Sequence, residues 1–163
     1  MMKIPFAVIL GSVPFLAMSQ GPTADEIRRN LPAGSLVLQA KPSDIDGYEL
    51  TVTYVNRTNH VVYMPPLEAG TTMVHAYAKH GKSYRQVPLR PSKMQIHRAS
   101  EMITDFKALS PGAKDSFTIF LNKHDIEGQK TLSKFDLTWS LNLILPDKTQ
   151  KPFRLDSNST LVK

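Results

Sequence analysis

The sequence predicts an all-β fold built on antiparallel strands. The main observation is the segment from Phe135 to Leu145, where six consecutive alternate positions are large and apolar and four of the five between them are polar. A strand places such side chains on one face, whereas a helix would scatter them around its axis. Turn signals separate several similar segments, and the chain lacks βαβ spacing. We therefore expect roughly seven or eight short strands in a sandwich or barrel.

Length and composition favour one globular domain. The chain has 163 residues, of which 41% are hydrophobic and 21% charged, and it contains no cysteine. The apolar share is enough for a core and excludes wholesale disorder or a fibrous repeat. Two cores would be hard to build at this length. The lack of cysteine excludes disulfides, thiolate metal sites and cysteine nucleophiles.

Residues 1–19 fit a secretory signal peptide. Lys3 supplies a positive start, residues 4–18 are almost wholly apolar, and Ala17 and Ser19 are the small residues before a cleavage after Ser19. We expect a periplasmic or secreted protein whose mature chain, residues 20–163, is a single domain. No other apolar run approaches the roughly 20 residues that cross a bilayer, so no transmembrane span is expected in the mature chain.

The mature chain is predicted to begin with a short helix and to continue with strands. Thr23 and Glu26 fit a capping box, and Pro32 to Gly34 ends this helix. Gly81 suits the turn of a hairpin, and residues 94–106 fit either a strand or a helical turn. The predicted strands cover residues 36–40, 48–54, 61–64, 73–78, 83–87, 117–121, 135–145 and 153–155.

Two local patterns resemble the immunoglobulin-like sandwiches of small exported bacterial proteins. In one, the alternating residues Leu50–Tyr54 run into the turn Asn56-Arg57-Thr58; in the other, Leu109–Gly112 precedes the alternating residues Phe117–Ile119. The resemblance implies an immunoglobulin-like antiparallel β-sandwich that lacks the cysteine pair of antibody domains, so that Trp139 has no disulfide to pack on. It implies nothing about function.

The sequence offers no catalytic residue set. It lacks the Gly-x-Ser-x-Gly, Ser-x-x-Lys and His-Glu-x-x-His motifs of common hydrolases. His124 adjoins Asp125 and His97 lies near Glu101, but such neighbours are common on protein surfaces. We expect no enzymatic activity.

The charge distribution points to an anionic partner. Residues 69–100 contain no Asp or Glu, although the whole chain has 14 of them beside 20 Lys and Arg. The predicted binding residues in this stretch are Tyr77, Lys79, Lys82, Tyr84, Arg85, Arg90, Lys93 and Arg98. A basic patch attracts anionic partners and speeds their encounter; the alternative is an ordinary solvated face. Because an exported protein seldom meets nucleic acid, we expect an acidic protein or another anionic envelope component.

The first hypothesis is therefore a non-enzymatic binding protein, of which an envelope immunity or inhibitor protein is one biological form. Arg85 and Arg90 would anchor carboxylates through bidentate contacts. Tyr77 and Tyr84 would add rigid contact area, and the lysines would set the association rate.

Two other hypotheses remain open. Met73, His75, Met94 and His97 offer thioether and imidazole ligands, which select Cu(I), and their spacing is loosely similar to that of exported copper chaperones. Those proteins close the site with a late His-x-Met pair that is missing here, and methionines also fill core gaps. Otherwise no cofactor is expected. The third hypothesis is an accessory subunit of a cell-surface assembly, paired through an exposed strand edge.

Overall fold

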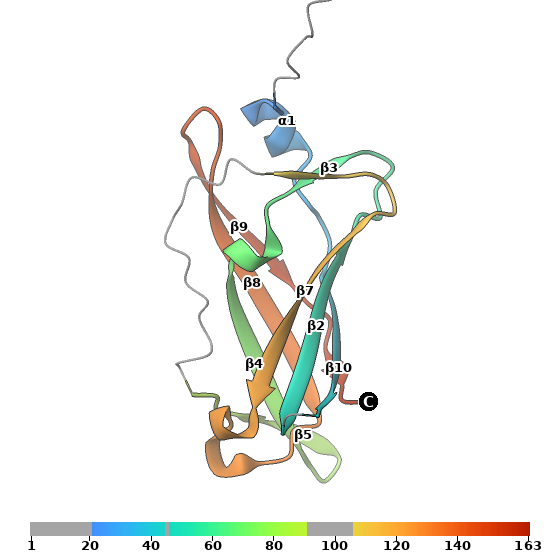
Figure 1. Ribbon diagram of the computed structural model, residues 1–163, viewed down its shortest axis with the longest axis vertical. Helices are drawn as coiled ribbons and strands as arrows, with labels where there is room; N and C mark the ends of the chain where they lie inside the picture. Colours follow the sequence, from blue (N-terminus) through green and yellow to red (C-terminus); the bar gives the residue numbers. More distant parts are fainter. Residues whose placement is uncertain (1–20, 45, 91–105) are drawn as a thin grey trace, which may run out of the picture.

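The computed structural model describes residues 21–44, 46–90 and 106–163, and these form an all-β fold of antiparallel sheets (Figure 1). The predicted signal peptide and nearly all of the segment 94–106 lie outside the described residues. Every strand predicted from alternation is present, with its ends shifted by at most three residues, and β6 and β10 are additional.

The described residues form one α-helix, strands and 3-10 turns, and η marks a single turn of 3-10 helix. They are α1 (Ala24–Arg29), β1 (Val37–Ser43), β2 (Gly47–Val55), β3 (Val62–Met64), η1 (Leu67–Ala69), β4 (Thr71–His80), β5 (Ser83–Val87), β6 (Lys107–Leu109), β7 (Lys114–Asn122), η3 (Lys123–Asp125), η4 (Glu127–Gln129), β8 (Lys134–Ile144), β9 (Gln150–Asp156) and β10 (Thr160–Leu161).

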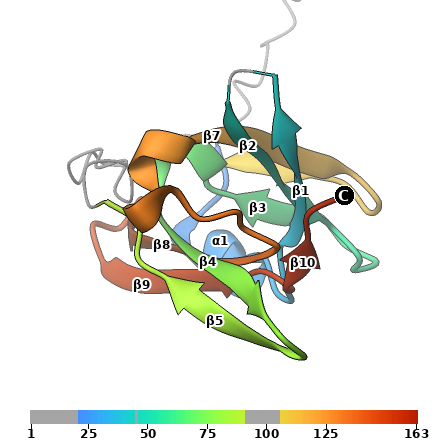
Figure 2. The ribbon, with the colours of Figure 1, turned by 90° about the horizontal axis from the view of Figure 1, so that it is seen from below.

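Two main sheets face each other, and Figure 2 shows them as two layers. One sheet has the order β1-β2-β7; the other has the order β10-β8-β4-β5, with β9 also paired to β8. Strands β3 and β6 form a small third sheet. Residues 157–163, here called the C-terminal segment, connect the two layers. Ser157 bridges to Leu36, just before β1, and Val162 bridges to Ala40 within β1, while β10 pairs with β8.

The main core lies between the two layers. Tyr48 of β2 meets Phe135 of β8 edge-to-face, with 5.3 Å between the ring centroids. Trp139 is fully buried, and its indole N–H donates a hydrogen bond of 2.6 Å to the Leu67 carbonyl. Its ring packs edge-on against Phe153. Trp139 therefore rests on a helical turn and a second aromatic ring.

Helix α1 begins at the predicted capping box. The Thr23 hydroxyl accepts a hydrogen bond from the Glu26 amide, and the Glu26 carboxylate accepts one of 2.7 Å from the Thr23 amide. Ile27 on the buried side of the helix packs with Leu143 and Leu145 in a second, smaller core. The long strand β8 therefore contributes side chains to both cores.

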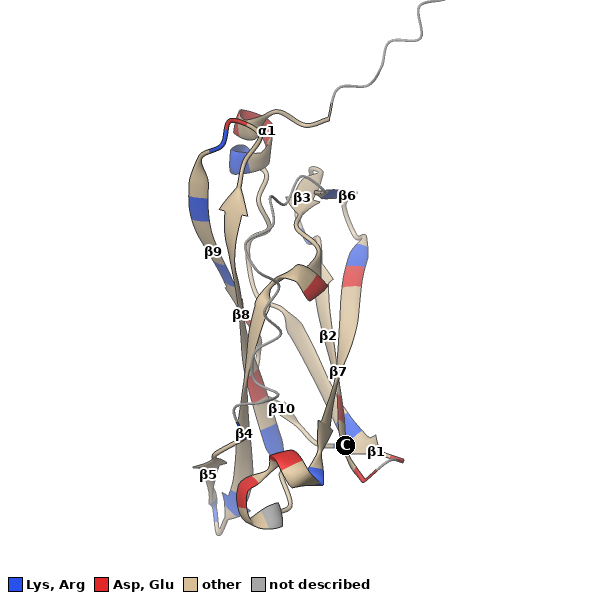
Figure 3. Ribbon diagram, turned by 60° about the vertical axis from the view of Figure 1, so that its left-hand side comes forward, with Lys and Arg blue, Asp and Glu red and all other residues tan. Residues whose placement is uncertain are grey.

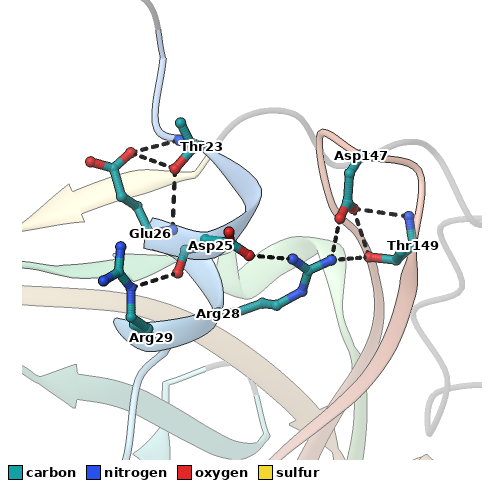
Figure 4. Close-up of polar contacts among 7 residues, drawn as sticks. All are labelled: Thr23, Asp25, Glu26, Arg28, Arg29, Asp147 and Thr149. Carbon is teal, nitrogen blue, oxygen red and sulfur yellow. Dashed lines mark hydrogen bonds and ion pairs between the residues drawn. The ribbon is translucent and has the colours of Figure 1, made fainter.

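Arg28 fixes α1 to the turn between β8 and β9 (Figure 4). Its guanidinium contacts the Asp147 carboxylate and the Asp25 carboxylate, and it donates a hydrogen bond of 2.6 Å to the Thr149 hydroxyl. These contacts hold the first helix of the described chain against a turn about 120 residues further along it.

Candidate functional site

The predicted basic hairpin forms from β4 and β5. His80 pairs with Ser83 across a loop of two residues, and Lys79 and Tyr77 pair with Tyr84 and Gln86. Gly81 in the loop has a φ of 62°, in the left-handed region that favours glycine. The hairpin therefore has the predicted turn. Strand β5 has the predicted bounds, and β4 extends two residues further at each end.

The register of this hairpin divides the predicted binding residues between its two faces. Side chains that pair directly across an antiparallel ladder share a face, so Tyr84 lies with Lys79, and Tyr77 lies on that same face two residues away along β4. This face points away from the core, because the alternate residues Val74 and Ala76 are buried.

Arg85 lies on the other face of the hairpin. It pairs with Ala78 and lines a hollow of about 300 Å³ together with Lys130. Lys82 is exposed in the loop, and Arg90 is exposed beyond the end of β5, where its amide donates to the Asp125 carbonyl. Lys93 and Arg98 lie outside the described residues.

Lys134 joins the outward face from a distant part of the sequence. It lies opposite Tyr77 in the β4–β8 ladder, and its ammonium group lies 5.1 Å from the Tyr77 ring centroid and 5.6 Å from that of Tyr84. A cation held over aromatic rings is attracted by their electron-rich faces. The two tyrosines thus position a lysine that sequence reasoning missed, and only the pairing of β4 with β8 reveals it.

Tyr77, Lys79, Lys82, Tyr84 and Lys134 make up what we call the hairpin patch. Tyr84 is one of the exposed large apolar side chains, with 41% of its surface accessible. Burial, and a hydrogen bond to the Asp136 carboxylate, raise the pKa of the Tyr77 hydroxyl above its ordinary value. Tyr77 is therefore held in place, while Tyr84 is free to contact a partner.

The lysines of the hairpin patch have no acidic partner among the described residues. Some cations elsewhere in that part of the chain pair with Asp or Glu, namely Arg28, Lys41, Lys107, Lys123 and Arg154, whereas others, such as Lys114 and Lys151, have no ion pair there either. What distinguishes the patch is therefore the grouping of its cations around two tyrosine rings. Figure 3 shows the hairpin cations at one end of the molecule, with the acids of η3 and η4 beside them. The patch thus gathers three cations without ion pairs in the described chain, with Asp136 at its inner end and acidic turns on one side.

Half of the predicted copper ligands lie within the described residues. Met73 and His75 are on the outward face of β4, and Met73 is 44% exposed. Met94 and His97 lie outside the described residues. Within the described ranges, no group of three or more His, Cys, Asp or Glu side chains could hold a metal ion.

Comparisons with known proteins add no identification. A scan of protein-family models finds no match to the sequence, and searches of curated proteins and of solved structures find none either. In the part of the chain that the structure describes, no helix is both long and apolar enough to span a membrane.

Proposed function

We propose that this chain is an exported, non-enzymatic binding protein that engages an acidic protein through the hairpin patch. The observation that carries the proposal is the placement of Lys79, Lys82 and Lys134, without acidic partners in the described chain, beside the exposed ring of Tyr84. Tyrosine is enriched at protein interfaces, and clustered unpaired cations favour acidic partners. An envelope immunity or inhibitor protein would use such a surface to cover a partner's site.

Two further features belong to the same proposal. The net charge of residues 20–163, which is +5 once Lys3 is subtracted from the +6 of the whole chain, would assist the encounter with an acidic partner. The finer architecture that we propose is an immunoglobulin-like sandwich, and it is supported by two facing antiparallel sheets and by the hydrogen bond from the Thr58 amide to the Asn56 side chain at the end of β2.

A pull-down tests the proposed binding. Residues 20–163 would be immobilised and exposed to an envelope extract of the source organism at low and high salt. We expect one acidic protein that is retained at low salt, lost at high salt and lost with the triple variant Lys79→Ala, Lys82→Ala, Tyr84→Ala.

The matched control is the double variant Lys114→Ala, Phe120→Ala, which removes an exposed lysine and an exposed aromatic residue from the outward face of β7. It should retain the partner. Equal retention by the triple variant and the wild type would reject the hairpin patch as the binding surface. Both variants should keep the wild-type melting temperature within a few degrees, because the substituted side chains are exposed or partly exposed.

Copper binding is the second candidate, and the shared outward face of Met73 and His75 favours it. A thioether and an imidazole on one face of a strand would give two of the ligands that Cu(I) prefers. If copper binds, Cu(I) should raise the melting temperature of the wild type, and this shift should disappear in Met73→Leu. An unchanged melting temperature on adding Cu(I) would exclude this candidate.

A further inference from the structure

Between Lys134 and Ile144, the outward side chains of β8 are short and polar. They are Asp136, Thr138, Ser140 and Asn142, and they alternate with the buried apolar side chains of the core. Strand β4 lies on one side of β8, and β9 lies on the other. Larger outward side chains on these two strands, such as His75 of β4 and Arg154 of β9, flank the short side chains of β8.

Two hollows follow one another along this line. One, of about 420 Å³, is lined by Asp136, Thr138 and their neighbours on β4 and β9. The next, of about 340 Å³, is lined by Ser140 and Asn142. Arg154 lines both, so together they make a shallow trough along β8 that begins beside the hairpin patch.

Most polar groups of the trough already have partners. Arg154 donates to the Asp156 carboxylate at 2.8 Å, and the Thr138 hydroxyl donates to the same carboxylate oxygen at 2.8 Å. Two charges at the end of the trough nearest the hairpin patch have no opposite charge in an ion pair within the described ranges. They are the Asp136 carboxylate, which lines the first hollow near Tyr77, and the Lys134 ammonium, which lies over its two rings next to that hollow. They are two residues apart on one face of β8, about 6.7 Å along the strand.

We infer that the trough receives an extended segment of the acidic partner, running along β8. One carboxylate of that segment would face Lys134, and a lysine or arginine two residues away would face Asp136. In an extended chain, as in β8, residues two positions apart point in the same direction. The acidic and basic residues of the bound segment are therefore spaced like Lys134 and Asp136. The inference rests on the proposed function and adds to it a charge pattern, acidic and basic at a spacing of two, that a purely polyanionic partner lacks.

Four synthetic peptides test this pattern. Each is a capped, fluorescently labelled nonapeptide of alternating Ser and Thr, with positions 4 and 6 occupied by Glu and Lys, Lys and Glu, Glu and Glu, or Lys and Lys. Either mixed order fits, because the segment can run in either direction along β8. In fluorescence anisotropy at low salt we expect the better mixed peptide to bind about fivefold more tightly than the Glu-Glu peptide, since an attraction at Asp136 replaces a repulsion.

The variant Asp136→Lys should reverse this order and make the Glu-Glu peptide the tightest. Its control is Asp44→Lys, which makes the same change of charge at an exposed turn outside the trough, and the order of the peptides should then stay as in the wild type.

Two results with the peptides would overturn the inference: the wild type binds the Glu-Glu peptide most tightly, or it binds no peptide at millimolar concentration. A third is that dextran sulfate displaces every peptide and binds Asp136→Lys and Asp44→Lys with equal affinity, which would mean that any polyanion binds the surface. None of these decides the proposed function, because the pull-down with the hairpin variants tests it separately.

Discussion

Gly70 leaves no room for a side chain beside Trp139. A Cβ atom there would lie 2.2 Å from Cε2 and Nε1 of the indole ring. The ring has nowhere to move, because it is fully buried and hydrogen-bonded to the Leu67 carbonyl. The absence of a side chain at this residue therefore allows η1 to cover the tryptophan.

We predict that Gly70→Ala lowers the free energy of unfolding by about 1–3 kcal/mol, as overpacking in a core usually does. Urea denaturation measures the difference. The control is Gly21→Ala, where a Cβ would meet nothing within 4 Å. Equal stability of the two variants would show that Trp139 can adjust.

Asn56 is a fully buried polar side chain at the end of β2. Its amide donates to the carbonyls of His60 and Leu109, at 2.8 Å each, and its oxygen accepts from the amide and hydroxyl of Thr58. The side chain thus joins the loop after β2 to the end of β6. Its hydrogen-bonding capacity is met within the protein.

Replacing Asn56 by alanine should cost about 1–3 kcal/mol in the free energy of unfolding, because the buried Leu109 carbonyl loses its side-chain donor. Thermal or urea unfolding would measure this. Asn59→Ala, an exposed neighbour in the same loop, should change stability little. A stability loss at Asn59 as large as at Asn56 would contradict the assigned role.

At the scale of elements, α1 depends on an ion pair at the turn between β8 and β9. Hydrogen bonds from Thr149 and then from Arg28 lower the pKa of the Asp147 carboxyl to about 2. A carboxyl whose pKa is lower in the folded state stabilises the fold above its unfolded value of 3.8, and this contribution is lost as the pH falls toward 2.

We predict that Asp147→Asn reduces the difference in urea midpoint between pH 5 and pH 2.5, since that variant has no carboxyl to protonate at the turn. Arg28→Ala should reduce the difference less, because Thr149 remains as a donor. An unchanged difference in both variants would mean that this carboxyl contributes nothing to the acid sensitivity of the fold.

The hairpin illustrates what sequence could and could not predict about the site. Gly81 and the flanking alternation were enough to predict the turn and both strands. They could not predict which side chains of β4 and β5 pair with each other, since this depends on a loop length that shifts the register by one residue. The period of two already places Tyr84 and Arg85 on opposite faces of β5, but Lys134 joins Tyr84 only through a long-range ladder.

At the scale of the whole molecule, the C-terminal segment connects the two sheets. The Asn158 amide donates to the Leu36 carbonyl and the Lys163 amide to the Ala40 carbonyl. The Asn158 side chain accepts from the Leu38 amide between them. These bonds attach one edge of the first sheet to the strand that pairs with β8.

We predict that removal of residues 157–163 lowers the free energy of unfolding by about 2–4 kcal/mol, the sum of a few backbone hydrogen bonds at about 1 kcal/mol each. Urea denaturation and hydrogen exchange at β1 would measure the effect. An unchanged midpoint would mean that the packed side chains alone hold the layers together.

The all-β class was predictable because long strands such as β2 and β8 bury every second side chain. The sequence of these strands therefore alternates between apolar and polar residues. The short strands β6 and β10 have no such period. They are defined by partners elsewhere in the chain, Val62–Met64 for β6 and Lys134–Phe135 for β10. The order of the strands in the sheets depends on contacts between distant residues, so the local sequence pattern does not predict it.

The connection between β1 and the C-terminal segment also bears on the order in which the chain can fold. Its bonding groups are about 120 residues apart in sequence, and folds closed by such distant contacts form slowly, on timescales of milliseconds to seconds. During synthesis from the amino end, the edge of the first sheet could not be completed until residues 157–163 had left the ribosome. The bonds that join the two sheets would therefore be among the last to form.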